Sequence, residues 1–201
     1  MTVDSPQALR QAYALPKGRA VTKQLSALDR HCIRFIELSP FLVLATASRA
    51  GHMDASPRGG EPGFVKVPDP VTLLLPDSPG NNRLDSFSNI VETREAGLLF
   101  MIPGVDETLR VNGPVAISDA AADIAACTTE RRAPKAVLRI TVREAYLHCA
   151  KAFMRSELWN PAKHQPRSAL PSAGQMLRDQ TGDTAPAESQ DAMRERYRRD
   201  L

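Results

Sequence analysis

Short apolar runs separated by turn-forming residues occupy the middle of the chain and constrain its fold most strongly. From Phe41 onward the sequence passes through "FLVLATA", "HMDASP", "FVKV" and "VTLLLPD", with Gly, Pro and Asp between the runs. Runs of this length and composition are typical of consecutive antiparallel strands. The chain has 201 residues, of which 42% are hydrophobic, which suffices for one core. We therefore expect a single domain over residues 1–201.

Further strand-like runs follow. In "LRVNGPVAI", Leu109, Val111, Val115 and Ile117 alternate with polar or small residues, which predicts one core face. The apolar run "GLLFMI" precedes it, and "KAVLRITVREAYLHC" again has the composition of a strand, centred on 137–142. With about six or seven strands, a mostly antiparallel sheet that closes into a barrel would hide the strand edges. The predicted class is mainly β with flanking helices.

Helical spacing appears before, between and after these runs. An N-terminal helix is expected at about 22–38, with Thr22 as its cap, and a second helix is expected to begin at or just after Asn82. A short alanine-rich helix is predicted near Ser118 or Asp119. From about residue 160 to 201 the tail should be helical or irregular, and a terminal helix would place Met193, Tyr197 and Leu201 on one face.

Composition excludes several functional classes. The 26 Lys and Arg residues exceed the 23 Asp and Glu residues by too little to suggest a nucleic-acid partner. No apolar run approaches the ~20 residues that span a bilayer, and the N-terminus lacks the apolar core of a secretory signal, so we expect a cytoplasmic protein with no membrane partner. Cys32, Cys127 and Cys149 are odd in number and widely spaced, which suggests neither a disulfide framework nor a metal site.

A loop between two predicted core elements carries an unusual set of donors. In "PGNNRLDS", Asn81, Asn82, Arg83 and Ser86 surround the expected start of the second helix. The N–H groups and positive dipole of a helix start attract anions, so the loop is a candidate phosphate site. The alternative is that an asparagine caps the helix and Arg83 is a solvated charge.

A second polar cluster surrounds Arg58. In "DASPRGGEPG", Ser56 and Pro57 precede this arginine and two glycines follow it. Glycines permit close backbone approach, and an arginine can grip a phosphate with paired N–H donors. A hairpin turn with an exposed arginine is the alternative.

A third cluster closes the last predicted strand. "HCAKAFMRSELWNP" places Lys151, Arg155 and Ser156 at helical spacing, and Trp159 is the only tryptophan of the chain. Two cations, a hydroxyl and an indole would suit an anionic aromatic ligand. They would equally suit a basic helix end packed against a tryptophan.

These motifs, in the order "SPRGG…GF…TLLLPD…GNNR.DS..NI", "LLFMIPG…TLRVNG" and "HCAKAFMRSELWNP", resemble the pyridoxamine 5'-phosphate oxidase-like family of FMN-binding split β-barrels, and more narrowly a bacterial flavin-nucleotide-binding branch. The resemblance implies a six-stranded split barrel and a homodimer with FMN in clefts between the subunits. It implies that Arg58, Asn82 and Arg83 hold the FMN phosphate. It places Lys151, Arg155, Ser156 and Trp159 near the isoalloxazine ring or the substrate.

The resemblance has limits. Relatives often carry an acidic residue where Gly60 stands, and the C-terminal Arg and His segment that binds substrate in true pyridoxamine phosphate oxidases is missing. The resemblance therefore implies an FMN-dependent oxidoreductase acting on a small molecule other than vitamin B6, with FAD or a deazaflavin as alternatives to FMN. A non-catalytic flavin-binding or sensing protein, or a haem-binding relative with His148 as axial ligand, are the other functional hypotheses.

Overall fold

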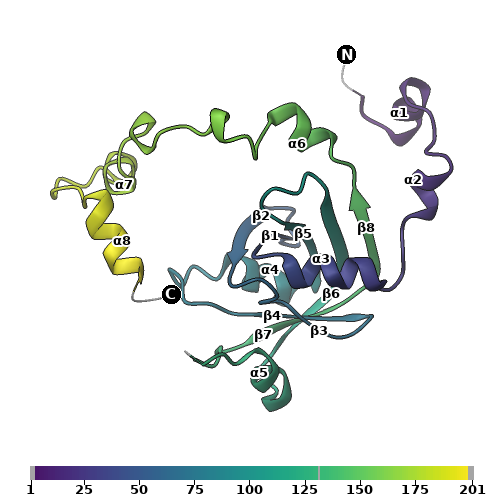
Figure 1. Cartoon of the computed structure of the whole chain (residues 1–201), viewed down its shortest axis with the longest axis horizontal. Coiled ribbons are helices and arrows are strands. Elements are labelled where there is room, and N and C mark those ends of the chain that lie inside the picture. Colours follow the sequence, from purple (N-terminus) through teal and green to yellow (C-terminus); the bar gives the residue numbers. More distant parts are fainter. Residues whose placement is uncertain (1–2, 131, 199–201) are drawn as a thin grey trace. The chain divides into compact units, whose positions relative to one another are not determined.

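The computed structural model describes residues 3–130 and 132–198 (Figure 1). The chain separates into two compact units, the first ending at Ser156 and the second beginning at Glu157. The first unit contains the strands β1 (Phe41–Ala47), β2 (Met53–Gly59), β3 (Lys66–Asp69), β4 (Thr72–Pro76), β5 (Glu95–Met101), β6 (Thr108–Ser118), β7 (Val137–Thr141) and β8 (Glu144–His148). Its helices are α1 (Pro6–Ala12), α2 (Arg19–Thr22), α3 (Arg30–Leu38), α4 (Asp85–Thr93), α5 (Ala121–Cys127) and α6 (Lys151–Ser156).

The strands form one eight-stranded sheet in the order β2-β1-β5-β6-β7-β4-β3, with β8 paired to β6. Every pairing is antiparallel, and the long strand β6 serves two parts of the sheet. Its first half pairs with β8 and its second half with β7. The fold is therefore mainly antiparallel β with flanking helices, a split-barrel architecture, and the predicted class is confirmed.

The strand count exceeds both the six strands that the resemblance implies and the six or seven read from the sequence. The segment "KAVLRITVREAYLHC" forms two strands, β7 and β8, where the sequence predicted one. Between them, the Arg143 N–H donates to the Asn112 carbonyl oxygen at 3.0 Å, so the chain crosses from one half of β6 to the other. A Cβ atom on Gly113 would lie 1.9 Å from the Thr141 carbonyl oxygen, so this crossing requires a residue without a side chain.

Alternation along the strands builds the core. Leu42 and Leu44 of β1 and Leu98 and Phe100 of β5 are buried on one face of the sheet. On β6 the predicted core residues Leu109, Val111 and Val115 are also buried, whereas Ile117 is 36% exposed. Ile117 lies near the end of β6, beyond the region where β5 pairs with it.

The N-terminal helix is shorter than predicted. The sequence predicted one helix at about 22–38 with Thr22 as its cap, but Thr22 ends α2, and α3 begins only at Arg30. The carboxylate of Asp29 accepts hydrogen bonds from the N–H groups of His31 and Cys32 and so caps α3. Residues between the two helices are held by backbone bonds of Leu25 to Ala145 at 2.8 and 2.9 Å, and this pairing excludes a continuous helix.

Two other helix starts are later than predicted. The alanine-rich helix α5 begins at Ala121, not at Ser118 or Asp119, because the Ser118 hydroxyl donates to Asp123 Oδ2 at 2.7 Å and lies before the helix. Helix α4 begins at Asp85, later than the expected start at or just after Asn82.

The second unit is helical and irregular, as predicted for the tail. It contains two short 3-10 helices, η1 (Pro161–Lys163) and η2 (Arg167–Ala169), followed by α7 (Ala173–Thr181) and α8 (Gln190–Arg198). Met193 and Tyr197 both lie on α8, while the predicted third member of their apolar face, Leu201, lies outside the described residues. None of the helices described in either unit is long and apolar enough to cross a membrane. The single-domain assignment stays a prediction.

Candidate functional site on strand β2 and helix α4

The loop before α4 ends in left-handed backbone. Asn82 and Leu84 both have φ of 58°, so the helix begins at Asp85 rather than just after Asn82 as predicted. The Asn81 Oδ1 atom accepts from the Arg83 N–H at 3.1 Å and shapes the loop. No side chain caps α4, so the N–H groups of its first turn remain available to an anion.

Strand β2 presents polar side chains to the interior. It is the edge strand beside β1, with Arg58 opposite Leu42, Ser56 opposite Leu44 and Asp54 opposite Thr46. Directly paired residues share a sheet face, so Arg58, Ser56 and Asp54 lie on the same side as the core leucines of β1. Helix α4 packs against β1 and β2, which covers these side chains.

A chain of hydrogen bonds joins the two elements. The Arg58 Nη2 atom donates to Ser86 Oγ at 3.2 Å, and the Ser86 hydroxyl donates to Asp54 Oδ2 at 2.5 Å. Thr46 Oγ1 lies 3.5 Å from the same carboxylate oxygen and accepts from Asn89 Nδ2 at 3.0 Å. We refer to Arg58, Ser86, Asp54, Thr46 and Asn89 as the β2–α4 polar cluster.

One donor of this cluster is unsatisfied. The Nε atom of Arg58 is buried and has no hydrogen-bond partner among the described residues. Leaving a buried donor of a charged group unpaired is costly, and such atoms are rare in folded proteins. An anionic oxygen beside Arg58 would satisfy it, so the cluster fits a bound phosphate.

A cavity of about 420 Å³ opens beside the cluster. It is lined by Ser48, His52, Met53, Asp54, Arg83, Asp85, Ser88 and Asn89. Arg83 is largely exposed, and its Nε donates to Asp85 Oδ2 at 2.8 Å. This hydrogen bond, with the charge of Asp85, raises the pKa of Arg83. The predicted phosphate ligands Arg58 and Ser86 therefore meet directly, while Arg83 reaches the neighbouring cavity and Asn81 and Asn82 remain exposed on the loop.

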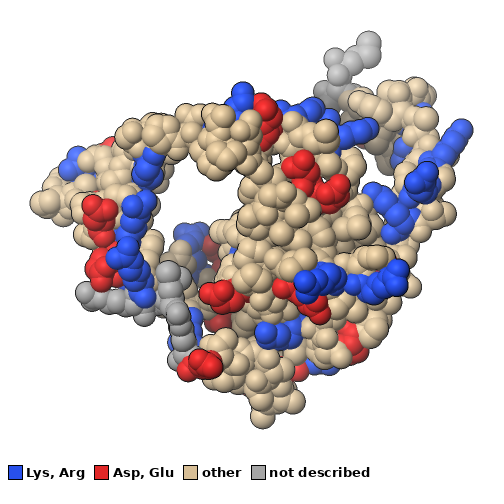
Figure 2. Space-filling model, viewed as in Figure 1, with Lys and Arg blue, Asp and Glu red and all other residues tan. Residues whose placement is uncertain are grey.

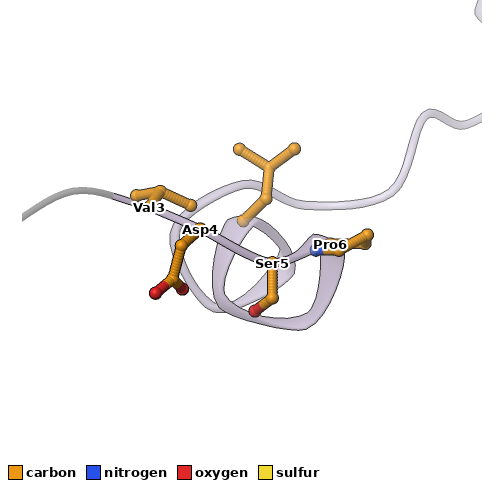
Figure 3. Close-up of a pocket in the computed structure, with 5 residues that line it drawn as sticks. Val3, Asp4, Ser5 and Pro6 are labelled. Atoms are coloured by element: carbon orange, nitrogen blue, oxygen red, sulfur yellow. The ribbon is translucent and has the colours of Figure 1, made fainter.

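A second hollow lies at the start of α1 (Figure 3). It has a volume of about 380 Å³ and is lined by Val3, Asp4, Ser5, Pro6 and Leu9. The Ser5 hydroxyl oxygen already accepts from the Ala8 N–H at 3.2 Å and caps the helix. With one carboxylate and no cation, this hollow does not resemble an anion site.

The third predicted cluster is divided. Lys151, Arg155 and Ser156 lie exposed on α6, but this helix ends at Ser156, and Glu157 takes a left-handed φ of 48°. Trp159 lies beyond the helix, in the second unit, so the prediction that one helical face aligns it with Lys151 and Arg155 is wrong. The Ser156 hydroxyl is engaged with the Phe153 carbonyl oxygen at 3.1 Å.

A known protein family matches most of the first unit. The model of the pyridoxamine 5'-phosphate oxidase family matches residues 28–149, which contain all eight strands and the β2–α4 polar cluster. The chain belongs to this family. Curated proteins give no match to the sequence.

Solved structures of similar fold include HupZ of Group A Streptococcus, at 17% identity and TM-score 0.49, covering 59% of this chain and 91% of that one. A putative pyridoxamine 5'-phosphate oxidase from Lactobacillus delbrueckii matches at 20% identity and TM-score 0.47, covering 62% and 98%. An FMN-binding protein from Syntrophomonas wolfei matches at 13% identity and TM-score 0.44, covering 60% and 83%.

Sequence reasoning missed part of the site. Asp54, Thr46 and Asn89 complete the polar cluster, yet none was predicted. Asp54 stands four residues before Arg58 on one strand, and strand residues at even spacing share a face, so its position was available as a signal. The pairing of Thr46 with Asp54 depends on strand register and could not be read from the residues alone.

Proposed function

We propose that this protein is a flavin-dependent oxidoreductase that binds FMN at the β2–α4 polar cluster and acts on a small-molecule substrate. Arg58 would hold the phosphate, with Ser86 in the first turn of α4 and with Asn82 and Arg83 beside it. The Ser86 hydroxyl, which donates to Asp54, would keep Arg58 in position. FMN bound there would supply hydride transfer, while the protein supplies binding and orientation.

The buried, unpartnered Nε of Arg58 is the observation that carries this proposal. The backbone of Arg58 is fixed in β2 and its Nη2 is bonded to Ser86 Oγ, so its Nε donor is kept in place for an incoming anion. Such preorganisation lowers the cost of binding, because little side-chain freedom remains to be lost. Membership of the pyridoxamine 5'-phosphate oxidase family supports FMN as the anion.

We also propose that the protein is a homodimer. The outward face of β1 and β5 carries the half-exposed or exposed side chains of Phe41, Val43, Leu99 and Met101, and Met53 of β2 is 76% exposed. A contiguous apolar surface of this kind is typical of a protein interface.

The cysteines Cys32, Cys127 and Cys149 are all unpaired, which supports a reducing, cytoplasmic location.

The binding test compares FMN with riboflavin, which lacks the phosphate. Arg58→Ala should weaken FMN about ten- to a hundredfold, the expected loss for a charge-assisted contact, and should leave riboflavin unchanged. Arg143→Ala is the matched control, because Arg143 is an exposed arginine paired with Glu95. Equal losses for FMN and riboflavin would mean that Arg58 supports the fold, and a colourless purified protein that binds no added FMN would overturn the proposal.

Turnover separates an enzyme from a flavin-binding sensor. With FMN bound, oxidation of NADH or NADPH in the presence of an electron acceptor should exceed the rate of FMN alone. Bound flavin that is reduced no faster than FMN in solution would favour the sensor.

A further inference from the structure

A second group of cations lies on the sheet face opposite the β2–α4 polar cluster. Arg110 of β6 and Tyr146 of β8 are directly paired, and Thr108 pairs with His148 two residues away. Their neighbours Leu109 and Val111 point into the core, so Arg110, Tyr146 and His148 occupy the outward face. Lys23, which follows α2, reaches this face and donates from Nζ to the Leu147 carbonyl oxygen at 2.7 Å.

Tyr146 organises this group. Arg110 Nη1 donates to the Tyr146 hydroxyl at 2.9 Å, and the guanidinium carbon lies 5.5 Å from the ring centroid. Lys23 Nζ lies 5.2 Å from the same centroid, and the His148 ring lies 5.1 Å from it. Contacts with an aromatic ring hold both cations by cation–π attraction, so they are fixed around one point without a carboxylate.

The group has unused binding capacity. Neither Lys23 nor Arg110 forms an ion pair with any carboxylate in the part of the chain that the structure describes. The nearby Glu144 is engaged with Asn112 at 2.5 Å and with Gln24. The Nε2 atom of His148 is buried and has no partner within the described ranges. Burial and the charges of Arg110 and Lys23 hold the pKa of His148 below its ordinary value.

Figure 2 shows Lys and Arg side chains gathered where Figure 1 places α2, beside β8. The backbone bonds between Leu25 and Ala145 join these segments. The N-terminal segment thus brings positive charge to the strand that carries Tyr146 and His148.

We propose that Lys23, Arg110, Tyr146 and His148 form a binding site for a doubly charged oxyanion, such as the phosphate group of a small molecule. A dianion would pair with the two cations, and it would stabilise a proton on the His148 imidazole, which then donates from Nε2. This site shares no residue with the β2–α4 polar cluster, and its test does not depend on the proposed function.

Imidazole NMR of the full-length protein with FMN added tests the site, using inorganic phosphate as the probe. The sequence has four histidines. His31 and His164 are exposed and lie outside the cavity beside the β2–α4 polar cluster, so their resonances serve as internal references. Phosphate should raise the pKa of His148 and leave the resonances of His31 and His164 in place. Lys23→Met and Arg110→Gln should each weaken this effect about tenfold in phosphate concentration. Lys66→Met is the control and should leave the effect of phosphate unchanged, because it removes an exposed lysine bonded to the Gly63 carbonyl oxygen.

Two further measurements test the charge of the ligand and the location of its site. Acetate, a monoanion, should act at least tenfold more weakly than phosphate, and equal action would overturn the assignment to a dianion. Arg58→Ala should leave the response of His148 intact, and its loss there would mean that His148 reports on the flavin site. A pKa of His148 that does not respond to phosphate would overturn the proposal whether or not the protein binds FMN.

Discussion

At the residue scale, the β2–α4 polar cluster combines donors for an anion with a carboxylate. Arg58 and Ser86 suit a phosphate, but Ser86 donates to Asp54 at 2.5 Å. A negative charge beside a phosphate is unfavourable, by roughly 1 kcal/mol or more at a few ångströms in a well-solvated setting. Asp54 therefore holds Ser86 in position at the expense of anion affinity.

Asp54→Asn should tighten FMN by about three- to tenfold and leave riboflavin unchanged, because the amide oxygen can still accept from Ser86 while the charge is removed. Fluorescence titration of both ligands measures the effect. Weaker FMN binding in this variant would show that the carboxylate is needed to position Ser86.

His148 gives a pH dependence of stability. Its folded pKa lies below its ordinary value of about 6.5, first because of burial and then because of Arg110 and Lys23. The unfolded state thus takes up a proton at a higher pH than the folded state. This contribution to stability is complete above pH ~6.5 and is lost as the pH falls toward the folded pKa.

Urea unfolding between pH 7.5 and 5.5, in a buffer without phosphate, should show this decline. His148→Gln should flatten it, whereas His31→Gln, which removes an exposed histidine, should not. The same slope in all three proteins would assign the dependence to other groups.

At the element scale, strand β6 holds the fold together. It pairs with β5, β7 and β8, and the chain passes from β7 to β8 directly over Gly113. A side chain at this position would overlap the Thr141 carbonyl oxygen and force the strands apart. The crossing that creates two strands from one predicted segment depends on this glycine.

Gly113→Ala should lower the free energy of unfolding by roughly 1–3 kcal/mol, the usual cost of overpacking in a core. Gly80→Ala is the control, since a Cβ there meets no atom within 4 Å. Chemical denaturation measures both, and a Gly113→Ala protein as stable as the Gly80→Ala protein would contradict the close approach of the two segments.

At the scale of the whole molecule, the outward face of β1, β2 and β5 exposes apolar side chains. Met53 is 76% exposed and Phe41 is 37% exposed on this face. The proposed homodimer would bury these side chains. The proposed oxyanion site adjoins this surface, because Arg110 of β6 pairs directly with Leu99 of β5.

Met53→Asp should dissociate the dimer, because an interface does not readily bury an unpaired carboxylate. Light scattering at micromolar concentration should report a dimer for the parent protein and a monomer for the variant. Val91→Asp is the control, since Val91 is 69% exposed on α4. A parent protein that is monomeric with FMN bound would contradict the homodimer.

The mainly β class followed from the sequence alone, and the sequence singled out Arg58 and Ser86, which the structure brings into hydrogen-bond contact. Alternating apolar residues and turn formers are local signals, since each depends on neighbours a few positions away. The predicted helix starts at Thr22, Asn82 and Ser118 were wrong. Leu25 pairs with Ala145 and interrupts the first helix, and left-handed residues precede the second. The Ser118 hydroxyl bonds to Asp123 and lies before the third.

Only the tertiary structure placed Asp54 against Ser86, and Lys23 beside Tyr146 and His148. It also showed that the helix bearing Lys151 and Arg155 stops before Trp159. Strand register sets which side chains share a face, and a shift of one residue would reverse every assignment. Register arises from pairing between segments as far apart as Thr72 and Thr141, so no local pattern encodes it.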